Sequence, residues 1–197
     1  LPGGLELAAG DGIRLTWSYP STSAFRIFRV VQATDTWSNV APETGFLVGV
    51  TRDSQVVANL RPVGPVTYLA VWVHEGPDEP TARGSQPTLV ATGQVVWPPD
   101  EMTLSVTPSG EVTARFRVPM EASVEVQRFP EGFTVEYSQM RALPAVAVTG
   151  NGFEDKQPPI GEWLTYALYC VATLSDGRME VSDPVTARTR VDRDPIR

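Results

Sequence analysis

The stretch Ile13-Arg14-Leu15-Thr16-Trp17 alternates large apolar side chains with polar ones. A period of two is typical of a β-strand that buries one face, because successive side chains of a strand point to opposite sides. A second stretch, Val112-Thr113-Ala114-Arg115-Phe116, repeats the pattern with Phe116 in the place of Trp17. The arginine and threonine side chains between the apolar ones would face water. The sequence therefore predicts the same half-buried strand at two places in the chain.

A repeat of about 98 residues extends outward from these two strands. An offset of 99 residues aligns Leu5, Leu7, Ile13, Leu15, Trp17, Pro20, Phe25 and Ile27 with Leu104, Val106, Val112, Ala114, Phe116, Pro119, Val124 and Val126. Further on, the offset is 98 for Tyr68 with Tyr166 and 97 for Ser85 with Ser182. Because surface loops tolerate insertions at little cost in stability, small loop-length changes explain the slip.

Each copy of the repeat contains about seven short apolar runs, a number typical of a β-sandwich. In the first copy they lie near residues 4–8, 12–18, 24–31, 46–50, 54–59, 66–74 and 87–96. The 16 glycines and 18 prolines interrupt the chain too often for a helical bundle. We therefore expect an all-β protein with two tandem immunoglobulin-like sandwiches, at residues 1–97 and 98–197. Two prolines in Trp97-Pro98-Pro99-Asp100 would stiffen the connection.

Both copies resemble the fibronectin type III domain in three groups of residues that cover nearly the whole chain. These groups are the Ile13 to Trp17 strand with Pro20, the turns Leu60-Arg61-Pro62-Val63-Gly64 and Ile160-Gly161 that lead to Tyr68 and Tyr166, and the last-strand starts Ser85-Gln86-Pro87 and Ser182-Asp183-Pro184. The resemblance implies that each tyrosine buries its ring and that its hydroxyl bonds the backbone.

The chain departs from the family pattern at three points. The first copy has two extra residues between Leu60 and Tyr68, and the second copy has Phe116 for tryptophan and Gly161 where the family usually has proline. No Arg-Gly-Asp triplet occurs, so integrin-type adhesion is not supported. The resemblance implies a fold strongly but a function only weakly, because sandwich domains serve many unrelated functions.

Charge and cysteine content exclude several classes of protein. The formal net charge is −7, with −2 on residues 1–97 and −5 on residues 98–197, so neither half offers the basic surface that nucleic acids or anionic membranes require. No run approaches the ~20 apolar residues that span a bilayer. The single Cys170 rules out a disulfide within the chain and leaves the compartment open, with an extracellular or cell-surface location favoured over the cytoplasm. The start at Leu1 suggests a segment of a larger, bacterial protein.

No cofactor, metal or catalytic centre is expected. His74 is the only histidine, so a hydrolase has a single candidate base. The better interpretation is that His74 lies at the end of a strand, at the margin of the sheet, and that a solvated loop follows it. Cys170 shares the predicted inward side of its strand, where a buried thiol is unreactive. The Glu154-Asp155 pair with Asn151 lacks the alternating oxygen ligands of a calcium loop, and we interpret it as a solvated turn.

An exposed apolar face is the most informative feature of the first copy. If Tyr68, Ala70 and Trp72 point inward, the opposite parity places five apolar side chains together on the outer face. They are Phe28, Val30, Leu69, Val71 and Val73. Such a face typically marks a protein interface, here for a partner, a flanking domain or a second copy in a homodimer. Two alternatives stay open: a loop at residues 32–45 covers the face, or the strand register has slipped by one residue.

A carbohydrate platform is a further candidate. Trp163 and Tyr169 share the outward parity of one strand in the second copy, and exposed aromatic side chains often stack on sugars in β-sandwich modules. A structural role for both is the alternative. The sequence thus predicts a non-catalytic protein-interaction or spacer module, with an accessory carbohydrate-associated module as the second hypothesis.

Overall fold

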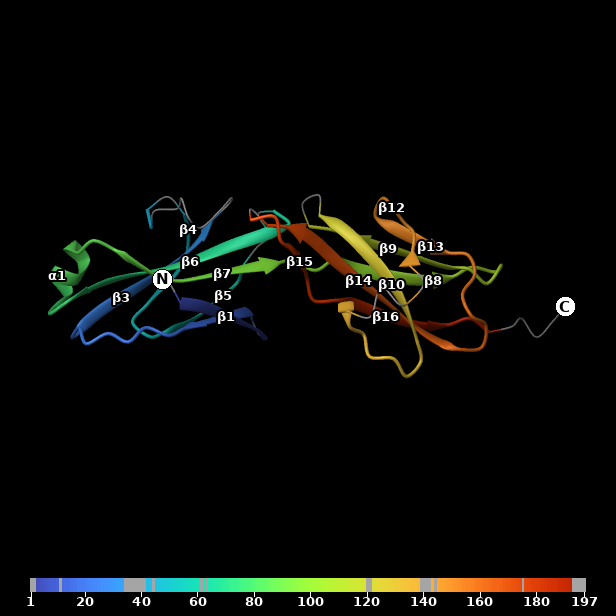
Figure 1. Cartoon of the computed structure of the whole chain (residues 1–197), viewed down its shortest axis with the longest axis horizontal. Coiled ribbons are helices and arrows are strands. Elements are labelled where there is room, and N and C mark those ends of the chain that lie inside the picture. Colours follow the sequence, from blue (N-terminus) through green and yellow to red (C-terminus); the bar gives the residue numbers. More distant parts are fainter. Residues whose placement is uncertain are drawn as a thin grey trace. The chain divides into compact units, whose positions relative to one another are not determined.

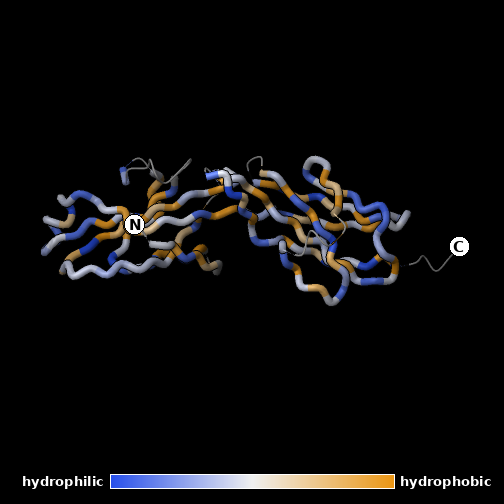
Figure 2. Tube along the Cα trace, viewed as in Figure 1, coloured by the Kyte–Doolittle hydropathy of each residue, from blue (hydrophilic) through white to orange (hydrophobic). Residues whose placement is uncertain are grey.

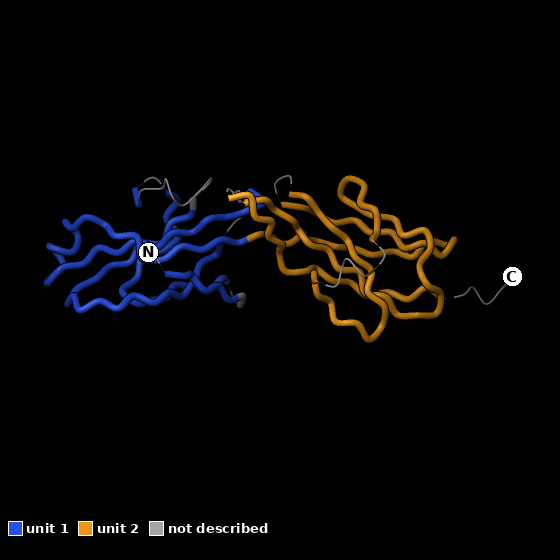
Figure 3. Tube along the Cα trace, in the orientation of Figure 1, with its two compact units in different colours: residues 1–95 blue, residues 96–197 orange. Residues whose placement is uncertain are grey.

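A computed structural model describes residues 3–10, 12–33, 42–43, 45–60, 62, 64–119, 122–138, 143, 145–174 and 176–192 of the chain. The chain consists of two compact units, Leu1–Val95 and Val96–Arg197 (Figure 3). The division lies two residues before the boundary expected from the sequence. Each unit has its own hydrophobic core.

The first unit is a seven-stranded sandwich (Figure 1). One layer contains β1 (Gly3–Gly10), β2 (Gly12–Trp17) and β5 (Gln55–Ala58), and the other contains β4 (Phe46–Thr51), β3 (Phe25–Ala33), β6 (Val66–Gly76) and β7 (Thr88–Val96). Strand β1 joins the layers, because Gly3 and Gly4 pair with β7 in parallel before the strand pairs with β2. These seven strands confirm the runs predicted for the first copy.

A short helix, α1 (Glu79–Gly84), was not predicted and lies between β6 and β7. It begins after Asp78, whose carboxylate accepts a hydrogen bond from the Thr81 backbone N–H at 2.9 Å, as an N-cap residue does. Glu79 and Arg83 form an ion pair one turn apart. Within the described ranges, no helix is long and apolar enough to cross a membrane.

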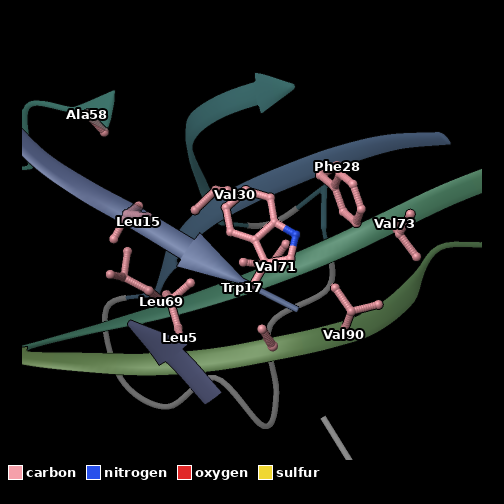
Figure 4. Packing of buried hydrophobic residues seen from close by; sticks show 11 residues of the cluster. Leu5, Leu15, Trp17, Phe28, Val30, Ala58, Leu69, Val71, Val73 and Val90 are labelled. Carbon is pink, nitrogen blue, oxygen red and sulfur yellow. The ribbon is translucent and has the colours of Figure 1, made fainter. Parts of the chain in front are cut away.

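Trp17 lies at the centre of the first core. Its ring meets Phe28 edge to face at a centroid distance of 5.3 Å, and Figure 4 shows it among the labelled residues of this core. Its backbone N–H donates to the Ser54 carbonyl at 3.1 Å, which holds β2 beside the start of β5.

The second unit repeats this two-layer architecture. One layer contains β8 (Asp100–Val106), β9 (Val112–Arg117), β13 (Gly152–Asp155) and β12 (Val148–Thr149), and the other contains β11 (Ala145–Val146), β10 (Ser123–Pro130), β14 (Trp163–Thr173), β15 (Met179–Val181) and β16 (Val185–Arg190). Hydrophobic residues recur along the strands of both units (Figure 2). Phe116 is buried as Trp17 is, and its N–H donates to Asn151 at 3.0 Å in the way that Trp17 bonds Ser54. The predicted equivalence of Trp17 and Phe116 is confirmed.

The two predicted corner tyrosines differ from each other. Tyr166 buries its ring in the second core, but its hydroxyl donates to the Asp155 carboxylate at 2.7 Å instead of to the backbone. Asp155 is therefore a buried structural residue. The interpretation of Glu154-Asp155 as a solvated turn is wrong, because both residues belong to β13, although Glu154 is exposed as expected. Tyr68 is buried outside the first core cluster, on the other face of β6 from Leu69.

Candidate interaction surface

The apolar face predicted for the first unit is wrong, because its five residues form the core. Phe28, Val30, Leu69 and Val71 are fully buried, and Val73 is 1% exposed. All five pack with Trp17 and Leu15 between the two layers (Figure 4). A substitution at any of them would affect folding before it affected binding.

The wrong face was predicted because the alignment of the two copies was displaced by an odd number of residues on these strands. The core-facing pair Phe28 and Val30 differs from its counterpart Val124 and Val126 by an even number of residues, whereas the alignment used an offset of 99. An odd error moves every side chain of a strand to the opposite face. On β6 the error has the opposite form: the alignment paired Tyr68 with Tyr166 at an even offset of 98, whereas the core-facing Leu69 differs from the core-facing Tyr166 by 97. Tyr68, Ala70 and Trp72, predicted to point inward, therefore lie on the face of β6 away from Leu69, Val71 and Val73. Of the two alternatives to an exposed apolar face, the register slipped by one residue is the correct one. The other alternative, a covering loop at residues 32–45, lies mostly outside the described residues.

The proposed carbohydrate pair does not form a platform. Trp163 is 39% exposed, but the Arg188 guanidinium lies over its ring at 4.6 Å. Tyr169 is only 2% exposed, because Val135, Tyr137 and Leu143 cover this part of the outer sheet. Its ring meets Tyr137 edge to face at 5.2 Å. The two aromatic side chains are therefore not available together.

Cys170 is buried, as predicted. Burial raises the pKa of its thiol to about 11, which disfavours the reactive thiolate. Among the described residues, no three His, Cys, Asp or Glu side chains gather in a way that would hold a metal ion.

A basic pocket of about 260 Å³ lies on the outer face of β3, β4 and β6 in the first unit, beside α1. We use this name for the cavity lined by Ile27, Arg29, Val50, His74 and Arg83. Arg29 stands on the central strand, paired with Val50 on one side and Trp72 on the other. The sequence analysis missed this pocket because its lining comes from three strands and a helix that was not predicted.

His74 is held in place by the backbone that follows α1. Its Nδ1 lies 3.0 Å from the Ser85 carbonyl oxygen, which only accepts hydrogen bonds, so Nδ1 carries a proton. Ser85 also accepts a bond from the Glu75 N–H and donates to the Ala82 carbonyl. His74 thus lies near the end of β6, as predicted, but it is partly buried and fixed in orientation, and helix α1 forms part of the segment predicted to be a solvated loop.

Strand β4 places exposed apolar side chains next to the basic pocket. A β-bulge opposite Val30 and Val31 shifts the register of β4, so that Leu47 pairs with Val31 and Val50 pairs with Arg29. Val31 and Arg29 share one face of β3, and Leu47 and Val50 therefore lie on the same outer face. Each is 55% exposed. In the described part of the sheet, β4 is the edge strand.

Two family models match the chain, one for each unit. Residues 4–95 match the model described as the second fibronectin type III domain of SaeA, and residues 99–190 match the model for the third. Together they cover nearly all of both units.

The curated relatives are from Mycolicibacterium smegmatis. In two strains, the protein named "Putative ESX-1 scaffolding and assembly protein SaeA" is 28% identical to this chain over 162 residues. The aligned region is 82% of this chain but 23% of the relative, so the chain spans about a quarter of the relative's length. Among solved structures, a two-domain fibronectin type III segment of chicken tenascin aligns over 96% of this chain and 98% of its own, with 16% identity and a TM-score of 0.43.

Proposed function

Because the chain belongs to the fibronectin type III family, as two tandem domains, we propose that it is a non-catalytic segment of a larger scaffolding protein that contacts protein partners. One observation carries the proposal: the two halves match consecutive domains, the second and third, of a family whose mycobacterial member is named for scaffolding and assembly.

The chemistry of the described residues supports the same proposal. Cys170 is buried, His74 has no neighbouring nucleophile bonded to it, and Asp155 is occupied by Arg128 and Tyr166. Catalysis by a triad or an acid–base pair needs such groups to converge on an open site. The exposed side chains of β4 and the basic pocket instead offer a contact surface.

A chimera tests the proposal. The matched 162-residue region of the mycobacterial relative is replaced by this chain, and the proteins that co-purify with the tagged chimera are quantified by mass spectrometry. The control chimera carries the two-domain tenascin segment instead, which has the same number of domains.

The expected result is that this chain preserves the co-purifying proteins of the relative and that the tenascin pair loses part of them. If both segments preserve the full set, the region acts as a spacer, and the proposed contact with partners is wrong. If the chimera with this chain loses the same partners as the control, the proposal also fails.

A further inference from the structure

Arg29 is a cation on a sheet face, and none of the ion pairs in the described part of the chain involves it. Its neighbours across the strands are Val50 and Trp72. Its Nε is buried and has no hydrogen-bond partner among the described residues. Buried polar atoms are normally hydrogen-bonded, because removing them from water without a partner is costly. The guanidinium is therefore suited to an anion supplied by another molecule.

The rest of the basic pocket has the same character. The ring of His74 uses Nδ1 for Ser85, and its Nε2 is buried without a partner in the described structure. Arg83, on the exposed rim, donates to Glu79 through Nε and Nη2. Glu79 also lies 3.6 Å from Arg52, so one carboxylate is shared between two guanidinium groups. The surroundings of Arg29 thus retain a net positive charge although the unit as a whole is acidic.

The apolar side chains beside the pocket restrict the kind of anion. Ile27 and Val50 form its wall, and Leu47 continues the exposed apolar surface along β4. A free dianion such as phosphate gains nothing from this surface, whereas a peptide can place an apolar side chain on it.

We propose that the basic pocket binds a carboxylate of a peptide segment in a protein partner, with a neighbouring apolar side chain of that segment lying on Leu47 and Val50. Arg29 is the principal donor, Arg83 is the secondary donor, and the apolar contact supplies the remaining affinity. The inference rests on the proposed role in contacting partners and names the chemistry of one contact.

Peptide titration of the full chain tests this assignment by following backbone amide signals in NMR spectra. The probe is the blocked peptide acetyl-Val-Glu-Leu-amide, whose only charge is the glutamate carboxylate. The comparison peptides are acetyl-Val-Gln-Leu-amide, which is neutral, and acetyl-Val-Gln-Leu with a free carboxyl terminus. The glutamate probe and the peptide with the free carboxyl terminus together distinguish a side-chain carboxylate from a terminal one.

Binding should shift the amide signals around Arg29, Val50 and His74, with the neutral peptide at least tenfold weaker than a carboxylate peptide. Arg29→Gln should weaken binding of the charged peptide at least tenfold. Arg14→Gln removes the same charge from the other layer of the same unit and should leave binding unchanged. If Arg29→Gln does not fold, Arg83→Gln on the exposed rim should still weaken binding several-fold.

Several outcomes would overturn the assignment: equal binding of the neutral peptide, shifts that map elsewhere, or displacement of the peptide by inorganic phosphate at a lower concentration than by acetate. Concentration-dependent shifts without peptide would identify a second copy as the occupant and would also overturn it. If the titration shows no binding but the chimera keeps its partners, carboxylate binding by this pocket is excluded and the proposed scaffolding role still stands.

Discussion

Tyr166 donates its hydroxyl to the Asp155 carboxylate at 2.7 Å inside the second domain. Arg128 Nη1 lies 2.6 Å from the same carboxylate oxygen and 3.2 Å from the Gln157 carbonyl. Asp155 stands on β13 in one layer, and Arg128 and Tyr166 stand on β10 and β14 in the other. One carboxylate therefore links the two layers of the sandwich.

Replacing Asp155 should destabilise the second domain strongly. Asp155→Ala leaves the Arg128 guanidinium, whose side chain is 15% exposed, without its counter-ion, and breaking such a pair costs about 3–5 kcal/mol. Urea unfolding of the full chain measures the change. The exposed neighbour Glu154 is the control, and Glu154→Ala should change stability by less than about 0.5 kcal/mol. Equal effects of the two substitutions would contradict the structural role of Asp155.

Tyr166 should make the second domain sensitive to alkaline pH. Burial raises the pKa of Tyr166, and the hydrogen bond to Asp155 raises it further. Above about pH 10 the unfolded chain loses this phenolic proton while the folded chain keeps it, so the free energy of unfolding falls by up to about 1.4 kcal/mol per pH unit. Below pH 9 the stabilisation is complete.

Urea unfolding between pH 8 and 11 checks this expectation. Tyr166→Phe should lower stability by about 1–2 kcal/mol at pH 8 through the lost hydrogen bond, but its stability should fall less steeply above pH 10. Identical alkaline slopes for the variant and the wild type would show that Tyr166 does not carry the effect.

Val71 should prove essential for folding of the first domain. Val71→Asp puts a carboxylate into the fully buried core beside Trp17 and should cost more than about 4 kcal/mol. Hydrogen exchange at neutral pH should show lost protection in residues 3–95 and retained protection in the second domain, which has its own core. Val57→Asp, at a half-exposed position of β5, is the matched control and should stay folded. A folded Val71→Asp protein would contradict the observed burial.

Cys170 should resist thiol reagents in the folded protein. Burial raises the pKa of the thiol to about 11, so that only about a thousandth of it is thiolate at pH 8. Dithionitrobenzoate should react slowly with the native chain and promptly after unfolding in urea. Prompt reaction of the native protein at pH 8 would show that the second domain opens readily around β14.

Alternation of side chains predicted the strands well. Ile13, Leu15 and Trp17 alternate with polar residues, and β2 begins and ends within a residue of the predicted run. The prolines and glycines between runs placed the turns correctly. Helix α1 was missed because six residues are too few for a periodic pattern, and its capping residue Asp78 is also common in turns.

The inward faces of β3 and β6 could not be predicted in the same way. From Val66 to Val71, β6 is buried on both sides, and from Tyr68 to Val73 its residues are hydrophobic on both faces, so the sequence shows no polar face there. Parity then depends on an exact count through the preceding loops, and those loops differ between the copies. The same uncertainty prevented prediction of the basic pocket. Arg29 and His74 belong to β3 and β6, and the predicted inner and outer faces of these strands were reversed.

The amino-acid sequence by itself determined that the chain folds as two similar β-sandwiches, because period-two patterning and repeated turn residues depend only on local order. Only the tertiary structure decided which side of β3 and β6 faces the core, and therefore which residues are available to a partner. The physical reason is that the local sequence of a strand with apolar residues on both faces does not indicate which face packs against the opposite layer. Packing between the layers, with Phe28 and Val71 meeting Trp17, selects one of them.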